Sequence, residues 1–366
     1  DINVLPAWTD GSTGSGVTIA VVDNGLQYTH PDLSTQYVPS ASWDFNGGDS
    51  NPIPDPINGD LHGTAAAGIA AANNDGSKCG VGVAYDAGLS GLRLTAGPTT
   101  DAMEASALNY AWDSNFIYSN SWGPLDDAAT LQGPGPLTLA ALQNGVTNGR
   151  GGKGSIYVWA AGNGGVYDPF TGASVADNVN YDGYANSRFA IAVGAVDDTG
   201  VRSLYSEPGA ALLVSAHSSG GEGSARPGVT TTDLMGADGF NTAGGSAGDC
   251  VTDFGSAANF TLRGTSSSAS IVSGVVALML QANPNLGWRD VQHILAKTAI
   301  ETGGEPYAIN GAGLHVNHKY GFGLVDAGAA VALAKTWTNV GTEALASSGT
   351  IAVNQLIPDD SPVGIT

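Results

Sequence analysis

The sequence is short of positive charge and of long apolar runs. It has 12 Lys and Arg residues against 33 Asp and Glu residues, a formal net charge of −21. Such a surface repels phosphate backbones and anionic lipid headgroups, so nucleic acids and membranes are not expected partners. The most apolar stretch, 271–280, is shorter than the roughly 18–20 residues that a membrane span needs. The acidity suits cationic ligands and calcium, or it serves solubility alone, and composition does not separate the two.

Cysteine is also scarce. Cys79 and Cys250 are the two in the chain, too few for a zinc framework of the usual spacing. They form either one long-range disulfide, which indicates an oxidising compartment, or two buried thiols. The chain opens at Asp1 without a basic and apolar leader, so we expect any targeting segment to have been removed or never included.

What the sequence does have is an alternation of short apolar runs and helical stretches. The runs that predict buried parallel strands are Val17–Val22, Leu89–Leu94, Ile156–Ala161 and Ala190–Val196. The stretches that predict helices are Gly63–Ala72, Thr100–Trp112, Leu137–Asn148 and Ser267–Ala282. This alternation predicts an α/β fold of three layers with a mostly parallel central sheet flanked by helices. Ligands of such sheets gather at the carboxyl ends of the strands.

Four segments carry the side chains of nucleophilic catalysis. Asp23 ends the predicted strand in "VTIAVVDNG", and His62 begins the predicted helix in "DLHGTAAAGIAAA". Ser266 lies at the start of the helix in "GTSSSASIVSGVVALML", and Asn163 follows the strand in "SIYVWAAGNGG". A carboxylate that orients an imidazole, which then takes the proton of a serine, makes an acyl-transfer triad. The Asn amide and the N–H groups at the helix start would stabilise the oxyanion.

Together these segments resemble the subtilisin-like serine proteases, specifically their kexin/furin (proprotein convertase) branch. Longer motifs carry the resemblance from "DINVLPAW" to about Ala334: "YSNSWGPLDDAATLQGP", "GRGGKGSIYVWAAGNGG", "NYDGYANS" and "NPNLGWRDVQHILA". The resemblance implies a catalytic domain over 1–335, with 336–366 a linker or the start of a C-terminal P-like β domain. It assigns the nucleophile to Ser266. Ser270 stands where the family usually has proline, which we expect to cost rigidity alone.

The resemblance also implies a secreted endopeptidase for protein or peptide substrates with basic cleavage sites. Ser121, Trp122 and Gly123 would form the strand that pairs with the substrate backbone. Asp126 and Asp182 would line the pocket for the residue before the scissile bond, P1. Two carboxylates in a narrow pocket select arginine or lysine, because a cation left unpaired there would be costly.

Further from the scissile bond the match weakens. Convertases have Asp directly after the catalytic Asp, where this chain has Asn24, and the acids before the family's His are reduced to Asp60. The fourth pocket keeps Glu104 and Tyr184, but Gln132 replaces an acid. We therefore expect strict basic specificity at P1 and a partial preference for a second basic residue.

Structural calcium is a further implication of the resemblance, at two or three sites with oxygen ligands. The residues that match the family's sites are, for the first, Asp32 and Asp75, with the backbone carbonyls of Asn73, Lys78 and Gly80 nearby; for the second, Asp126, Asp177 and Glu207; and for the third, Asp44 and Asp49, with Asn51 as an additional candidate. Plain acidic turns are the alternative, most of all for the third.

In this branch the positions of Cys79 and Cys250 pair, which would stabilise the fold by roughly 4–5 kcal/mol in the chain-entropy model. A propeptide and a P domain are the other partners that the branch implies. Two other functions stay open at this point. A peptide ligase would use the same nucleophile with an amine acceptor, and a catalytically silent peptide-binding scaffold would keep only the fold.

Overall fold

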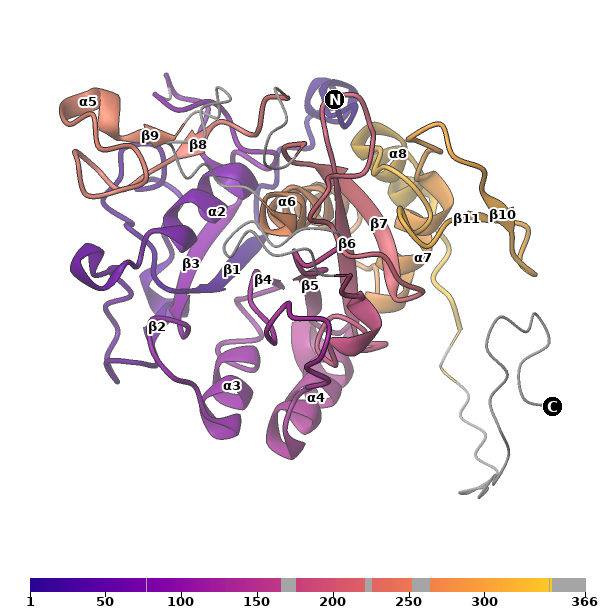
Figure 1. Ribbon diagram of the computed structural model, residues 1–366, viewed down its shortest axis with the longest axis horizontal. Helices are drawn as coiled ribbons and strands as arrows, with labels where there is room; N and C mark the ends of the chain where they lie inside the picture. Colours follow the sequence, from indigo (N-terminus) through magenta and orange to yellow (C-terminus); the bar gives the residue numbers. More distant parts are fainter. Residues whose placement is uncertain (77, 166–175, 221–225, 252–263, 342, 344–366) are drawn as a thin grey trace.

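The computed structural model describes residues 1–76, 78–165, 176–220, 226–251, 264–341 and 343. Within these residues, seven parallel strands form one sheet in the order β2-β3-β1-β4-β5-β6-β7 (Figure 1). Its strands are β1 (Thr18–Asp23), β2 (Trp43–Asp44), β3 (Gly88–Arg93), β4 (Ile117–Asn120), β5 (Ile156–Ala160), β6 (Ala190–Val196) and β7 (Leu212–His217). The helices are α1 (Leu5–Thr9), α2 (His62–Ala71), α3 (Asp101–Leu108), α4 (Pro136–Gly152), α5 (Gly245–Gly248), α6 (Thr265–Ala282), α7 (Trp288–Thr298) and α8 (Ala327–Thr336). Two small antiparallel sheets lie outside the large sheet. In one, β8 (Thr231–Thr232) pairs with β9 (Cys250–Val251), and in the other, β10 (Ala308–Ile309) pairs with β11 (His315–Val316).

The central strands are mainly apolar, and β5 and β6 are apolar throughout, because helices cover the sheet on both faces. In β1, Ile19 and Val21 belong to the core on one face, whereas Ala20 and Val22 belong to the core on the other. Alternate side chains of a strand point to opposite faces, so the two cores are separate layers of packing. The expected three-layer α/β fold is confirmed.

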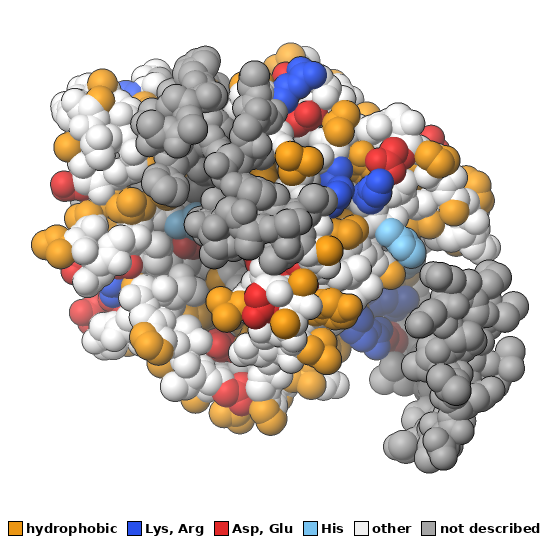
Figure 2. Space-filling view, in the orientation of Figure 1, with side chains coloured by type: hydrophobic (Ala, Val, Ile, Leu, Met, Phe, Trp, Pro, Cys, Tyr) orange, Lys and Arg blue, Asp and Glu red, His pale blue; other side chains and the backbone are white. Residues whose placement is uncertain are grey.

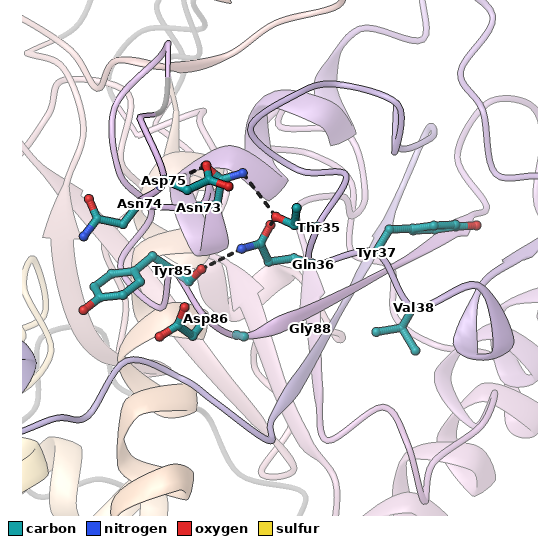
Figure 3. Close-up of a pocket in the computed structure, with 11 residues that line it drawn as sticks. Thr35, Gln36, Tyr37, Val38, Asn73, Asn74, Asp75, Tyr85, Asp86 and Gly88 are labelled. Carbon is teal, nitrogen blue, oxygen red and sulfur yellow. Dashed lines mark hydrogen bonds between the residues drawn. The ribbon is translucent and has the colours of Figure 1, made fainter.

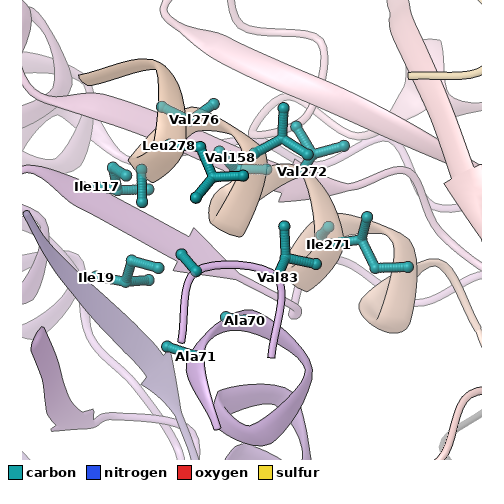
Figure 4. Packing of buried hydrophobic residues seen from close by; sticks show 14 of the residues in the cluster. Ile19, Ala70, Ala71, Val83, Ile117, Val158, Ile271, Val272, Val276 and Leu278 are labelled. Atoms are coloured by element: carbon teal, nitrogen blue, oxygen red, sulfur yellow. The ribbon is translucent and has the colours of Figure 1, made fainter. Parts of the chain in front are cut away.

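Helices α2, α6, α7 and α8 supply the larger core, and α3 and α4 supply the smaller one. Figure 4 shows Val272, Val276 and Leu278 of α6 packed beside Val158 of the sheet in the larger core. By length and composition alone, helix α6 could cross a membrane, but 89% of its 18 residues are buried inside the protein. It therefore acts as the central core helix of this layer.

The predicted helices and strands that carry the candidate site residues are present, with ends shifted by a few residues. β6 has the expected bounds, and α2 begins one residue earlier than expected, at His62. The helix predicted over Thr100–Trp112 is wrong beyond Leu108, because Asn109 already leaves helical geometry (φ −116°, ψ 3°), and the left-handed backbone of Ala111 (φ 50°) prevents it from resuming. Missed elements include β4, which has four residues, β7 and α8.

The predicted disulfide is confirmed: Cys79 and Cys250 are joined. The bond ties the loop that follows α2 to β9, across a sequence separation of 171 residues. The predicted domain boundary near 335 stays a prediction. Helix α8 ends at Thr336, and of the segment 336–366 the residues 342 and 344–366 lie outside the described part.

Candidate active site

An acid and an imidazole meet at the carboxyl end of the sheet. Asp23 is the last residue of β1 and His62 the first residue of α2, and Asp23 Oδ2 lies 2.8 Å from His62 Nδ1. Removal of the ring from water lowers the pKa of His62, but the charge of Asp23 and its hydrogen bond raise it by more, so the pKa lies above its ordinary value of 6.5. The second oxygen of Asp23 accepts a hydrogen bond from the Asn24 N–H at 2.8 Å, which fixes the carboxylate.

Ser266 is the second residue of the 18-residue helix α6. The helix starts directly after Gly264, whose φ of +113° is a conformation that L side chains rarely adopt. Ser266 is 6% exposed and lines the same cavity as His62. The partial positive charge of a helix N-terminus favours negative charge that develops beside the hydroxyl.

Asn163 lies opposite the start of α6. Its side-chain oxygen accepts hydrogen bonds from Thr265 N–H at 2.9 Å and from Thr265 Oγ at 3.2 Å. These contacts fix the orientation of the amide, whose Nδ2–H groups are the donors that Asn163 can offer to an oxyanion. Thr265 was missed in the sequence, although it adjoins the expected nucleophile. Thr265 Oγ also accepts a hydrogen bond from the Gly162 N–H at 3.2 Å, so Thr265 links the start of α6 to the Gly162–Asn163 segment.

These residues line one cavity of about 250 Å³. Its lining residues are His62, Ser121, Trp122, Gly123, Pro124, Asp126, Ala160, Gly162, Asn163, Asp182 and Ser266. Ser121 Oγ and Trp122 Nε1 are buried polar atoms that find no hydrogen-bond partner among the described residues. Buried polar groups of proteins are nearly always paired, so a bound peptide is a natural partner for both. Ser121–Gly123 follow directly after β4, which ends at Asn120, and carry no strand assignment of their own; their pairing with a substrate backbone stays a prediction.

One end of the cavity is acidic. Asp182 Oδ1 accepts the N–H groups of Tyr184 and Ala185, at 2.7 and 3.2 Å. Burial nevertheless raises the pKa of Asp182 to about 7, and the charges of Asp126 and Asp177 add to the rise. Asp126 accepts the backbone N–H of Asn163 at 2.8 Å, which connects this end to the Asn163 loop.

Behind this end lies a smaller pocket that adds Asp177 and Glu207 to Asp126 and Asp182. Burial, together with the neighbouring carboxylates, raises the pKa of Glu207 to about 9, although the Gly164 N–H bonds to it at 3.1 Å. Oxygen ligands of this kind suit calcium. In the described parts of the chain, however, no three Asp, Glu, His or Cys side chains are arranged as a metal-ligand cluster.

Comparison with known proteins agrees with this geometry. The family model described as the subtilase family matches residues 14–323. The chain belongs to the subtilase family. It is 41% identical to Furin-1 of Xenopus laevis over 349 residues, 94% of this chain and 40% of that protein. It is 43% identical to human proprotein convertase subtilisin/kexin type 7 over 362 residues, 98% of this chain and 43% of that protein.

Among solved structures, the serine protease of Aeromonas sobria has a TM-score of 0.75 and 26% identity, and covers 91% of this chain and 62% of its own. Fervidolysin from Fervidobacterium pennivorans, at 23% identity and a TM-score of 0.64 over 89% of this chain and 44% of its own, supports the fold alone. This chain spans less than half the length of Furin-1 and of proprotein convertase subtilisin/kexin type 7.

The outer substrate residues of this subtilase differ from expectation. Asp60, predicted to bind substrate, is 3% exposed and forms a salt bridge of 2.6 Å with Arg93. Asp44, predicted to bind calcium, lies 2.8 Å from the same guanidinium. An arginine at the end of β3 thus already pairs with the Asp60 carboxylate, and the substrate-binding role of Asp60 stays a prediction. The pairing of Arg93 with these carboxylates was not predicted, because nothing in its local sequence distinguishes it from other strand ends.

Glu104 and Tyr184 do lie together, but away from solvent. Glu104 is 7% exposed and accepts hydrogen bonds from Tyr184 OH at 2.8 Å and from Thr99 Oγ at 2.6 Å. Tyr184 in turn packs its ring on Trp122 and Trp159. The pair supports the floor of the cavity beside Trp122, and Glu104 does not present a free carboxylate to a substrate.

The first calcium site was placed at Asp32 and the loop after α2. Asp32 is 2% exposed, and its carboxylate accepts the backbone N–H groups of Lys78 and Cys79, at 2.9–3.0 Å. The side chain of Lys78 instead pairs with Asp249 at 2.9 Å. Gly80 follows Cys79 with a φ of +105°.

Asn73 and Asp75 of the same predicted site line an open cavity of about 630 Å³ (Figure 3). In it, Asn73 Nδ2 donates to Thr35 Oγ at 3.2 Å. At the third predicted site, the backbones of Asp44 and Asp49 are bridged, and Asp49 accepts the Asn51 N–H at 2.7 Å. The ligand roles of both sets stay predictions.

Proposed function

We propose that this subtilase is a serine endopeptidase that cleaves protein or peptide chains after arginine or lysine. The observation that carries the proposal is the single cavity that Ser266, His62, Asn163, Asp126 and Asp182 line. It combines the groups of acyl transfer with two carboxylates that attract a cation. The names of the convertase relatives agree with cleavage of proproteins.

The steps follow from the groups present. Ser266 Oγ attacks the scissile carbonyl while its proton passes to His62 Nε2, and Asp23 holds the other ring nitrogen. The amide of Asn163 and the N–H groups at the start of α6 stabilise the oxyanion. His62 then gives its proton to the leaving amine. Water, activated by the same imidazole, releases the acyl group from Ser266.

Specificity at P1 follows from the acidic end of the cavity. An arginine or lysine side chain that entered it would pair with Asp182 and Asp126, whose mutual repulsion it relieves. At P2 we propose only a partial preference for a basic residue. Asn24 is uncharged, and Asp60 is already paired with Arg93.

Calcium belongs to the proposal as a structural ion. Asp126, Asp177 and Glu207 supply the oxygen donors that calcium prefers, and a divalent ion would compensate their buried charge. Asp32 with Asn73, Asp75 and the backbone near Lys78 and Gly80, and Asp44 with Asp49, are weaker candidates. Their carboxylates already accept hydrogen bonds or, for Asp44, pair with Arg93.

The setting of the proposal is an oxidising compartment outside the cytoplasm, since the chain carries a disulfide. On the face in Figure 2, Lys and Arg side chains are few and lie mainly in the right half, whereas Asp and Glu side chains are scattered over the whole face. Such a surface attracts basic substrates and repels nucleic acid and anionic membranes. A propeptide and a P domain are proposed partners of the complete protein.

The test is a peptide-library cleavage profile with and without calcium, joined to active-site labelling. We expect cleavage after Arg and Lys and labelling of Ser266 by a fluorophosphonate. Ser266→Ala should lower kcat by about 10⁴-fold or more and abolish labelling. Product masses distinguish hydrolysis from transfer to an amine. Equal cleavage after Phe, or an unlabelled Ser266 in folded protein, would refute the proposal.

A further inference from the structure

The end of β7 and the start of α6 are tied together by buried hydroxyl groups. Ser218, the residue after β7, donates from its Oγ to the carbonyl oxygen of Gly264 at 2.9 Å. In the opposite direction, Ser268 in the first turn of α6 donates from its Oγ to the carbonyl oxygen of Ala216 at 2.9 Å. Ser218 is 3% exposed, and Ser268 is fully buried. A shift of one segment against the other would break a buried hydrogen bond, which is costly.

The Gly264 carbonyl belongs to the peptide group that contacts Asn163. The N–H of this peptide group is that of Thr265, which donates to Asn163 Oδ1 at 2.9 Å. The C=O and N–H of a planar trans peptide point in opposite directions, so Ser218 holds one side of the group and Asn163 the other. Gly264, with a φ of +113°, has no side chain to restrain its rotation. The hydrogen bonds on the two sides therefore fix the orientation of this peptide group.

Tyr205 orients the Ser218 hydroxyl in turn. The buried Tyr205 hydroxyl donates to Ser218 Oγ at 2.7 Å and accepts the Ser219 N–H at 3.2 Å. It also lies 3.0 Å from the carbonyl oxygen of Ser219, which already accepts a hydrogen bond from Ser203 Oγ. A carbonyl oxygen can only accept, so the Ser218 proton points at Gly264 and the Ser218 oxygen accepts from Tyr205. The two hydroxyls thus form a directed chain, and burial strengthens each hydrogen bond in it.

We propose that Ser218, oriented by Tyr205, is a positioning residue for the oxyanion: it holds the peptide group that directs the Nδ2–H groups of Asn163 at the scissile carbonyl. Neither Ser218 nor Tyr205 lines the catalytic cavity. The inference rests on the proposed function, because it concerns the acyl-transfer step. It goes further by naming what keeps the oxyanion donor in place. A donor that is already oriented needs no reorganisation while the negative charge develops.

The first experiment compares Ser218→Ala with the parent enzyme on a fluorogenic peptide that ends in Arg. We expect kcat to fall by about tenfold, less than the roughly 10²–10³-fold that loss of an oxyanion donor itself costs, and KM to stay within about twofold. A peptide boronate that ends in Arg forms a tetrahedral adduct on Ser266, and its affinity should fall by the same factor as kcat. A kcat within about twofold of the parent value in folded Ser218→Ala would overturn the proposal.

The pH profile of kcat separates this role from a disturbed catalytic pair. The acid limb should have the same midpoint in Ser218→Ala as in the parent, because Asp23 and His62 are unchanged. A shifted midpoint would place the effect of Ser218 on His62 and would overturn the proposal.

A double-mutant cycle with Asn163 separates positioning from a general loss of structure. In Asn163→Ala the amide that Ser218 orients is gone, so the addition of Ser218→Ala should lower kcat by less than about twofold. Tyr205→Phe should lower kcat by about three- to fivefold in the parent, the scale of one hydrogen bond, and by less than about twofold in Asn163→Ala. Equal losses in both backgrounds would show that Ser218 acts independently of Asn163 and would overturn the proposal.

Ser215→Ala is the matched control. Ser215 is a fully buried residue of β7 whose Oγ also donates to a backbone carbonyl, that of Tyr320 at 3.2 Å. Its loss should lower stability and leave kcat at the parent value. Ser218→Thr is the conservative variant, because it keeps the hydroxyl and Ser218 lines a cavity of about 330 Å³ that can take the added methyl group. Folded Ser218→Thr should keep kcat within about threefold of the parent, and a loss as large as that of Ser218→Ala would overturn the proposal.

Folding of each variant is checked by its melting curve. The rate at which a fluorophosphonate labels Ser266 is a second readout, since that reaction also places negative charge on an oxygen beside the nucleophile. The rate should fall with kcat in Ser218→Ala, and an unchanged rate would overturn the proposal. If Ser218→Ala does not fold, Tyr205→Phe decides by the same measurements. Failure of the parent to cleave any peptide after Arg would instead refute the proposed function, and the labelling rate would still test the role of Ser218.

Discussion

The two sides of the catalytic cavity are both acidic, but they balance their charge in different ways. On one side, Asp126, Asp177, Asp182 and Glu207 surround a small pocket, and burial raises the pKa of Asp182 and Glu207. On the other side, two carboxylates share the guanidinium of Arg93. Burial lowers the pKa of Arg93, but its pairing with Asp60 and Asp44 raises the pKa by more.

The difference shows how similar residue types can serve binding on one side and structure on the other. A carboxylate cluster with raised pKa values gains free energy when a cation enters, because the cation removes repulsion and restores the ionised form. The cluster of Asp44 and Asp60 gains little free energy from a further cation, because Arg93 already compensates its charge. We therefore assign substrate and ion binding to the first cluster and positioning to the second.

Loss of charge in the first cluster should have the largest effect. Asp182→Asn is expected to lower kcat/KM for peptides with Arg at P1 by about 10²–10³-fold, because it removes one partner of a buried charge pair. Peptides with uncharged P1 residues should change little. The measurement is steady-state kinetics on a matched P1 series. Asp198→Asn, at an exposed acid, is the control, and an equal loss in both variants would contradict the comparison.

Removal of calcium should have the next largest effect. Chelation is expected to lower the melting temperature by about 5–10 °C, since a ligand at 100 times its Kd adds about 2.7 kcal/mol of stability. Added calcium should restore the loss. In Glu207→Gln the calcium dependence should shrink, whereas Asp44→Asn should leave most of it. Differential scanning fluorimetry with a calcium titration is the measurement. A melting temperature indifferent to chelation would contradict the assignment.

The pH dependence should differ between KM and kcat. In the calcium-free enzyme Asp182, with a pKa near 7, is mostly protonated below that pH, so KM for Arg substrates should rise as pH falls through about 7, and calcium bound at Asp126 and Asp177 should move this midpoint to lower pH. His62 must be neutral to accept the serine proton, and its pKa is raised. The acid limb of kcat should therefore have a midpoint above 6.5. In Asp182→Asn the KM dependence should vanish while the kcat limb stays. A KM limb that persists in this variant would contradict the assignment.

Much of the site was predictable from the sequence because its residues lie at the ends of strongly patterned elements. β1 ends in Asp23 and α2 starts at His62, so the predicted ends of these elements indicated both residues. Ser266, one residue after the start of α6, was singled out among its neighbouring serines by the family resemblance. Parallel strands bring their carboxyl ends to one edge, which predicted the meeting of Asp23 with the others.

The rest depended on pairings that no local pattern encodes. Arg93 meets Asp60 across 33 residues of sequence, and Asp44 across 49. Glu104 meets Tyr184 across 80. Such contacts follow from strand order and loop paths, which periodicity does not specify. As a result, acids that looked free in the sequence proved to be occupied by partners from other segments.

The smallest predicted effect comes from adding charge to the second side. Asn24→Asp keeps an acceptor for the Gly63 N–H and adds a negative charge to the residue whose backbone carbonyl accepts Arg93 Nε. The segment beside His62 then carries a charge that Arg93 offsets only in part, which favours a P2 cation. We expect the ratio of kcat/KM for peptides that end in Arg-Arg over those that end in Ala-Arg to rise about three- to tenfold, in line with a partly exposed ion pair. Asn46→Asp, in the loop after β2, is the matched control. A rise that persists in 1 M salt would argue against an ionic cause, because an exposed pair is screened there.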